Sequence, residues 1–188
     1  MSFLSDDRLL WFVNRGTGVV VLILLTFSLT LGVLATVRAS SHWWPRFVTQ
    51  ALHRNIALLA LALLTAHAGS AIVDGFVDIQ MIDAVVPFGA GYETLWSALG
   101  TIALDLVVLA IVTSLARHRF GRRRWRAVHL TTYLAWPLGL AHGLGIGTDQ
   151  RTGWSIGVTA ACVGLVVVSL GIRLTGLTHE RRLEAAVG

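Results

Sequence analysis

Four histidines lie in two hydrophobic segments of the sequence, two in each segment. His53 and His67 are fourteen positions apart, and His129 and His142 are thirteen apart. Fourteen residues make nearly four helical turns, so in a helix His53 and His67 lie within about 40° of one face and about 21 Å apart along the axis. An ionisable side chain inside a membrane is costly, which makes each of these imidazoles a candidate functional group.

The two segments are expected to run in the same direction, so their histidines match in depth. We therefore expect His53 to face His129 and His67 to face His142. Two neutral imidazoles that face each other between helices suit the axial positions of a haem iron. On a straight helix the thirteen-residue spacing leaves His129 and His142 about 140° apart around the axis. Pro137 lies between them and is expected to kink or rewind the helix.

Two other interpretations of the histidines remain open. Zinc is the competing metal, but a pair of histidines lacks the third and fourth ligands that zinc requires. Alternatively, the histidines serve helix packing alone, in a haem-free bundle that acts as an interaction or transport subunit.

The composition indicates an integral membrane protein. Of 188 residues, 55% are apolar and 13% charged, and the mean hydropathy is +0.71. This is more apolar surface than one soluble core of this size encloses. All fifteen basic residues are arginine, and we do not expect them to form a nucleic-acid-binding surface. The single cysteine, Cys162, excludes an intramolecular disulfide and a cysteine metal cluster.

Five apolar runs are long enough to cross a hydrocarbon core of about 30 Å. Because every backbone amide in a bilayer must be satisfied within its own segment, we expect each run to be a helix. The predicted fold is an all-α membrane helical bundle, a single domain over residues 1–188, with a sixth span not excluded. The five predicted spans cover residues 11–37, 48–73, 94–116, 125–147 and 154–176.

The distribution of charge predicts the orientation in the membrane. Residues 117–126 carry six arginines, which favours the cytoplasmic side, whereas residues 74–93 contain four carboxylates and no basic residue. We therefore expect a multi-pass protein of a bacterial-type cell membrane, with the N-terminus outside and the C-terminus cytoplasmic. The acidic segment offers a negative surface to a basic partner or a cationic species.

Four further residues are candidates for contact with a haem. Arg54 and Arg126 are placed to bind the propionates of the inner haem, and Arg151 those of the outer one, because guanidinium groups bind carboxylates bidentately. Anchoring of the cytoplasmic side explains the first two arginines equally well. Tyr133 follows His129 by one turn and is expected beside the inner haem. Asp105, in the middle of a span, is expected to be protonated or hydrogen-bonded.

Two stretches of this chain resemble a known family. HRNIALLALALLTAHAGSAIVDGF and TSLARHRFGRRRWRAVHLTTYLAWPLGLAHGLGIGTD look like the ferric reductase-like transmembrane family, whose relatives include the membrane cores of NADPH oxidases and the haem subunit of bacterial methionine sulfoxide reductase systems. The resemblance covers roughly residues 8–175. It implies two b-type haems, bound by the four histidines, and electron transfer across the membrane.

The chain also departs from its larger relatives. They continue into a cytoplasmic domain that binds FAD and NAD(P)H and usually have six spans, whereas we expect no flavin on this chain and find no GxGxxG motif after a strand. We therefore expect the electron-transfer subunit of an oxidoreductase, with a separate flavoprotein or quinol as donor. The acceptor at the outer face is expected to be a protein, with or without a flavin, or a small molecule. The alternative is a quinol-linked cytochrome b subunit of a respiratory enzyme.

Overall fold

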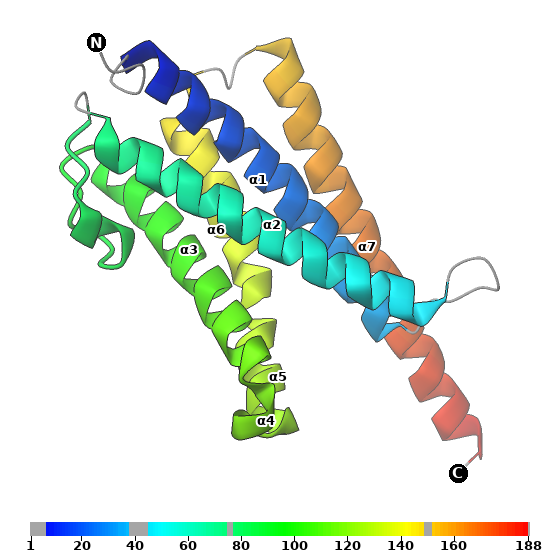
Figure 1. Cartoon of the computed structure of the whole chain (residues 1–188). Coiled ribbons are helices and arrows are strands. Elements are labelled where there is room, and N and C mark those ends of the chain that lie inside the picture. Colours follow the sequence, from blue (N-terminus) through cyan, green and yellow to red (C-terminus); the bar gives the residue numbers. More distant parts are fainter. Residues whose placement is uncertain (1–6, 38–44, 75–76, 149–151, 188) are drawn as a thin grey trace.

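The computed structural model describes residues 7–37, 45–74, 77–148 and 152–187, and within these ranges it is helical with no strand. Figure 1 shows the helices side by side, with the first and last long helices running beside each other. The elements are α1 (Asp7–Thr36), α2 (Arg46–Val73), the 3-10 helix η2 (Met81–Ala84), α3 (Thr94–Leu115), α4 (Arg117–Phe120), α5 (Arg122–Leu130), α6 (Thr132–Ile146) and α7 (Gly153–Val187).

Four of the described helices are long and apolar enough to cross a membrane. They match four of the five predicted spans within a few residues, and they establish a multi-pass membrane bundle. The matching stretches are Leu9–Thr36, Arg46–Val73, Thr94–Leu115 and Gly153–Thr175. Beyond the last of them, α7 continues as a helix to Val187, where the sequence suggested only a tail.

The fourth predicted span, residues 125–147, differs from expectation because it is not one helix. It is divided into α5 and α6 at Thr131, and α6 has only 15 residues. The backbone N–H of Thr131 donates to Val128 O and that of Leu134 to Thr131 O, so the chain tightens into 3-10 geometry at this point. A 3-10 residue advances about 120° where an α-helical residue advances 100°, which rotates His142 towards the face of His129. The distortion lies six residues before Pro137, which α6 contains within its length.

The helices associate as two closely packed pairs. α1 packs along α2, and α3 packs along α6, with α5 continuing along α3. α7 covers the opposite side of α1. Figure 1 shows that α3 and α6 diverge from α1 and α2 towards α4 and α5.

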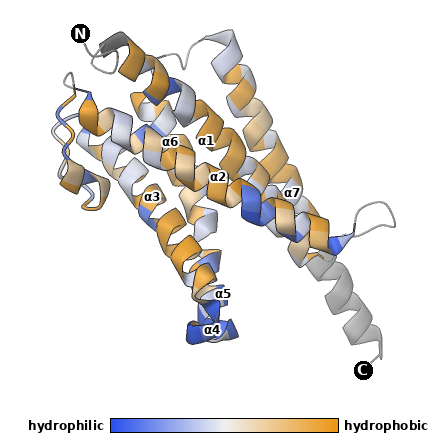
Figure 2. Ribbon diagram, in the orientation of Figure 1, coloured by the Kyte–Doolittle hydropathy of each residue, from blue (hydrophilic) through white to orange (hydrophobic). Residues whose placement is uncertain are grey.

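One end of the bundle is strongly hydrophilic. Figure 2 shows hydrophilic residues gathered on α4 and α5 and hydrophobic residues along the lengths of α1, α3 and α7. We call the end with α4 and α5 the arginine-rich end, because Arg117, Arg119, Arg122, Arg123, Arg124 and Arg126 belong to it. The other end carries the start of α3 and the end of α2.

The hydrophobic core lies where α1, α6 and α7 meet. Trp136 from α6 packs with Cys162 and Val166 from α7 and with leucines of α1. The indole N–H of Trp136 donates to Thr26 Oγ1 at 2.8 Å, which satisfies the only polar atom of a buried tryptophan. Cys162 is thus a free, buried thiol, as the sequence suggested.

Candidate functional site

The structure brings together both histidine pairs expected from the sequence. The ring centres of His53 and His129 lie 6.0 Å apart, with the ring planes at 77°. Those of His67 and His142 lie 6.1 Å apart, with the planes at 89°. The pair His53–His129, nearer the arginine-rich end, joins α2 to α5. The pair His67–His142 joins α2 to α6 near the other end.

These separations suit two ligands of one metal ion. Two imidazoles bound to opposite sides of an ion place their ring centres roughly 6 Å apart, because a metal–nitrogen bond is about 2 Å long and the ring centre lies about 1.2 Å behind the nitrogen. Direct stacking would bring the rings closer. Among the described residues, no group of three or more His, Cys, Asp or Glu side chains could hold a metal ion. Each pair could thus supply two ligands to a metal ion.

Helix α1 orients both histidines of α2 through backbone carbonyls. His67 Nδ1 lies 2.9 Å from Asn14 O, and His53 Nδ1 lies 2.9 Å from Ser28 O. A carbonyl oxygen only accepts, so in both rings Nδ1 carries the proton, and an imidazole that is neutral in this tautomer has its lone pair on Nε2. This is the arrangement typical of metal-binding histidines, whose second nitrogen is held by an outer partner. The side-chain amide of Asn14 also donates to His67 O at 2.9 Å.

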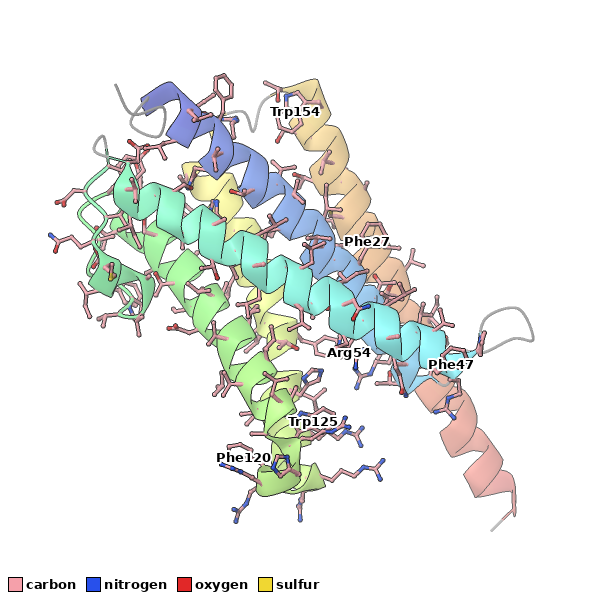
Figure 3. The ribbon with its side chains drawn as sticks, in the orientation of Figure 1. Phe27, Phe47, Arg54, Phe120, Trp125 and Trp154 are labelled. Carbon is pink, nitrogen blue, oxygen red and sulfur yellow. The ribbon has the colours of Figure 1, made fainter. Side chains whose placement is uncertain are left out.

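Helix α3 orients the other two histidines, but less symmetrically. His142 Nδ1 lies 2.8 Å from Trp96 O, which repeats the arrangement on α1. His129 Nδ1 instead faces the hydroxyl of Ser114 at the longer distance of 3.4 Å. The same hydroxyl accepts from Trp125 Nε1 at 3.0 Å, and the Trp125 ring stacks on His129 with centres 5.2 Å apart. Figure 3 labels Trp125 at the arginine-rich end of the bundle.

Three of the four imidazoles pack directly against a glycine of the neighbouring helix. A Cβ atom at Gly18 would lie 3.1 Å from His67 Cε1, and one at Gly32 would lie 3.4 Å from His53 Cε1. One at Gly100 would lie 2.5 Å from His142 Nδ1. Each glycine therefore makes room for a ring whose N–H reaches the neighbouring backbone.

The contacts of the carbonyl and the glycine with each imidazole recur at the same spacing along the helix. Each of the three glycines stands four residues after the carbonyl that accepts the imidazole proton, so that one turn of helix both binds the ring and clears space for it. The three carbonyl–glycine sets are Asn14 with Gly18, Ser28 with Gly32, and Trp96 with Gly100. At the fourth position Ser114 replaces the glycine. The α1–α2 unit and the α3–α5–α6 unit are thus built alike.

Sequence reasoning missed these supporting residues, although a signal was present. Gly18 and Gly32 are fourteen positions apart, as are His53 and His67. Gly100 and Ser114 are also fourteen apart. A small residue that recurs at the spacing of the histidines indicates a neighbouring helix in the same register.

The other candidate residues occupy varied positions. Arg54 and Arg126 are exposed near the arginine-rich end, one residue from His53 and three from His129 (Figure 3 labels Arg54). Arg151 lies outside the described residues. The hydroxyl of Tyr133 is bonded by Arg173 Nη1 of α7, whose guanidinium also lies 5.1 Å from the Tyr133 ring centre.

Two more polar residues lie within the helices. Asp105 is half-buried on α3, and helical geometry turns it about 140° away from Gly100, so it does not face the histidines. Arg15, which the sequence analysis did not single out, donates to Thr148 Oγ1 and lies over the Trp11 ring at 4.9 Å. Arg15 is therefore a basic group near the His67–His142 end, next in sequence to Asn14.

Comparison with known proteins gives the same assignment as the sequence motifs. The family model described as ferric reductase like transmembrane component matches residues 17–140, a stretch that includes His53, His67 and His129 and ends two residues before His142. No curated protein and no solved structure matches the chain. The matched stretch covers about two thirds of the chain. The chain therefore belongs to the ferric reductase-like transmembrane component family.

Proposed function

We propose that this membrane electron-transfer component is a di-haem b-type cytochrome, which carries electrons between the two faces of the membrane as the membrane subunit of a reductase system. The observation that carries the proposal is the presence of two imidazole pairs, each with ring centres close to 6 Å apart. A single such pair would also fit a packing contact. Two pairs at two depths, each with ordered outer partners, favour two redox centres in series.

The donor set fits haem iron better than other metals. Each histidine pair would hold one haem iron through neutral imidazole nitrogens, and the porphyrin would supply the other ligands. Zinc would require further protein ligands. A haem held in this way supplies a one-electron couple between Fe(III) and Fe(II).

The protein's own groups have distinct roles in this proposal. The carbonyls of Asn14, Ser28 and Trp96 hold Nδ1–H, which fixes the tautomer and keeps Nε2 free as the ligand atom. The same hydrogen bonds prevent the rings from rotating when the charge on the metal changes. Apolar side chains of the spans exclude water, so little reorganisation accompanies each electron transfer.

We place the arginine-rich end in the cytoplasm, following the distribution of basic residues. His53 and His129 would then hold the inner haem, and His67 and His142 the outer one. His67 lies about 21 Å from His53 along α2. A separate flavoprotein or a quinol is the proposed donor, and a protein or small molecule at the outer face the acceptor. Exposed Arg54 and Arg126 are the proposed partners of inner propionates.

Purified protein tests the proposal directly. A reduced-minus-oxidised spectrum should show a b-type α band, and chemical quantification should find two haems per chain. His67→Ala and His142→Ala should each leave one haem, and both should lose the same spectral component. His53→Ala and His129→Ala should both lose the other component.

The matched control is His118→Ala, which removes an exposed imidazole of α4 and should leave two haems. A colourless preparation from haem-replete cells would reject the proposal. So would losses that do not follow the two pairs. Reduction in liposomes by a quinol, compared with reduction by a flavoprotein, then separates the two classes of donor.

A further inference from the structure

We propose that the connection between α2 and α3 is an interfacial anchor, with the apolar side chains of η2 and the residues after it inserted into the lipid leaflet farther from the arginine-rich end. The sequence alone suggested a solvated acidic loop. The structure instead turns an acidic side chain inward and apolar side chains outward. The inference does not depend on haem binding.

The carboxylate of Asp83, which would oppose insertion into lipid, makes its contacts within the loop. Asp83 is buried and its Oδ2 accepts the backbone N–H of Gln80 at 2.8 Å, in a reciprocal capping arrangement around η2. A Cβ atom at Gly89 would overlap Asp83 Oδ1, which shows how closely the chain closes over this carboxylate. The backbone of the loop thus covers the carboxylate of Asp83.

The apolar side chains of the same segment point outward. Met81 is 77% exposed, Ile82 60%, Val85 65% and Phe88 60%. Contiguous exposed apolar surface of this kind marks a contact with lipid or with another protein. The depth of the segment in the membrane distinguishes a contact with lipid from a contact with another protein.

The segment folds back along α3 and does not project beyond its end. Thr101 Oγ1 donates to Asp83 O at 2.7 Å, which ties η2 to a residue seven positions inside α3. Seven residues correspond to about 10 Å along a helix axis. Figure 1 shows the connection lying beside the first half of α3. Because α3 has 22 residues and is about 33 Å long, close to the roughly 30 Å of the hydrocarbon core, a point 10 Å from its end lies inside the border of the hydrocarbon.

Backbone N–H groups of the loop are also hydrogen-bonded, as a position at this depth requires. Irregular backbone is tolerated near lipid only where its polar groups are satisfied. The N–H groups of Val85 and Val86 both donate to Ile82 O, and that of Asp83 donates to Gln80 O. Leu95, in the first turn of α3, is also exposed.

Spin labels on single cysteines test the insertion. In a Cys162→Ala background reconstituted into vesicles of phosphatidylethanolamine and phosphatidylglycerol, labels at Ile82→Cys and Phe88→Cys should collide with oxygen more than with a water-soluble nickel chelate. Leu109→Cys, exposed in the middle of α3, gives the lipid reference. Asp78→Cys, exposed in the same loop, is the matched control and should show the opposite preference.

We expect a several-fold higher ratio of oxygen to nickel collisions at positions 82 and 88 than at 78. Labels at 82 and 88 that respond mainly to the nickel chelate would overturn the inference. Labels shielded from both reagents would also overturn it, since they would show that a protein, such as a second copy of the chain, covers the loop.

Discussion

The glycines that pack against the imidazoles permit a graded prediction. Gly32→Ala, Gly18→Ala and Gly100→Ala each add one methyl group beside a ring, at 3.4, 3.1 and 2.5 Å from its nearest atom. The first distance is the limit of ordinary van der Waals contact. The last cannot be accommodated unless the ring or a helix moves.

The imidazole of His142, beside Gly100, cannot move without losing a contact. His142 is held by its 2.8 Å hydrogen bond to Trp96 O, so displacing the ring breaks that bond or pushes α3 away from α6. Overpacking of a close-packed site costs about 1–3 kcal/mol. At 1.4 kcal/mol per factor of ten, haem binding at the pair His67–His142 should weaken roughly 5- to 150-fold. Gly18→Ala should weaken the same site less, and Gly32→Ala should leave the pair His53–His129 nearly unchanged.

The assay is the number of haems per chain, measured together with helical content by circular dichroism. Gly100→Ala should retain its helices and hold one haem after dilution, with the His53–His129 spectrum intact. Gly16→Ala is the matched control, because nothing lies within 4 Å of its added methyl group. That variant should keep both haems and gain a little stability, since alanine is favoured over glycine in a helix. Full haem content in Gly100→Ala, or a greater loss in Gly32→Ala than in Gly100→Ala, would refute the reasoning.

Three further variants test individual contacts. Ser114→Ala removes the outer partner of His129 and should raise the reduction potential of the haem at the pair His53–His129 alone. The expected shift in a redox titration is roughly 20–60 mV, the size expected for one weak hydrogen bond. An equal shift of both haems would contradict this assignment. Tyr133→Phe should keep two haems and lower thermal stability in detergent by about 1 kcal/mol, because the hydroxyl binds Arg173; loss of a haem would contradict this expectation. Trp136→Ala should destabilise the bundle by about 3–5 kcal/mol in thermal or denaturant unfolding, and a change below 1 kcal/mol would show that the α1–α6–α7 core is not cooperative.

Much of this protein could be predicted from local sequence. The apolar runs predicted four of the membrane helices within a few residues, because a helix in lipid must satisfy its own backbone whatever surrounds it. The spacing of His53 and His67 predicted two depths on one face, and the partners His129 and His142 followed from matching those depths. The family match agrees with the motifs around these residues.

The remaining features depend on contacts between segments distant in sequence. The sequence could not show that the chain overwinds at Thr131, which brings His142 round to His67 despite the thirteen-residue spacing. Nor could it pair Tyr133 with Arg173, forty positions away.

The sequence by itself determined which imidazoles form pairs and at what spacing along α2 the pairs lie, because helix geometry fixes the rise and rotation along one chain. Only the tertiary structure decided how those imidazoles are held. A ring nitrogen finds its carbonyl on a different helix, and the close approach requires a glycine there, as Gly100 provides for His142. The same holds for the connection before α3, where composition suggested an acidic surface but the packing of Asp83 turned the apolar side chains outward.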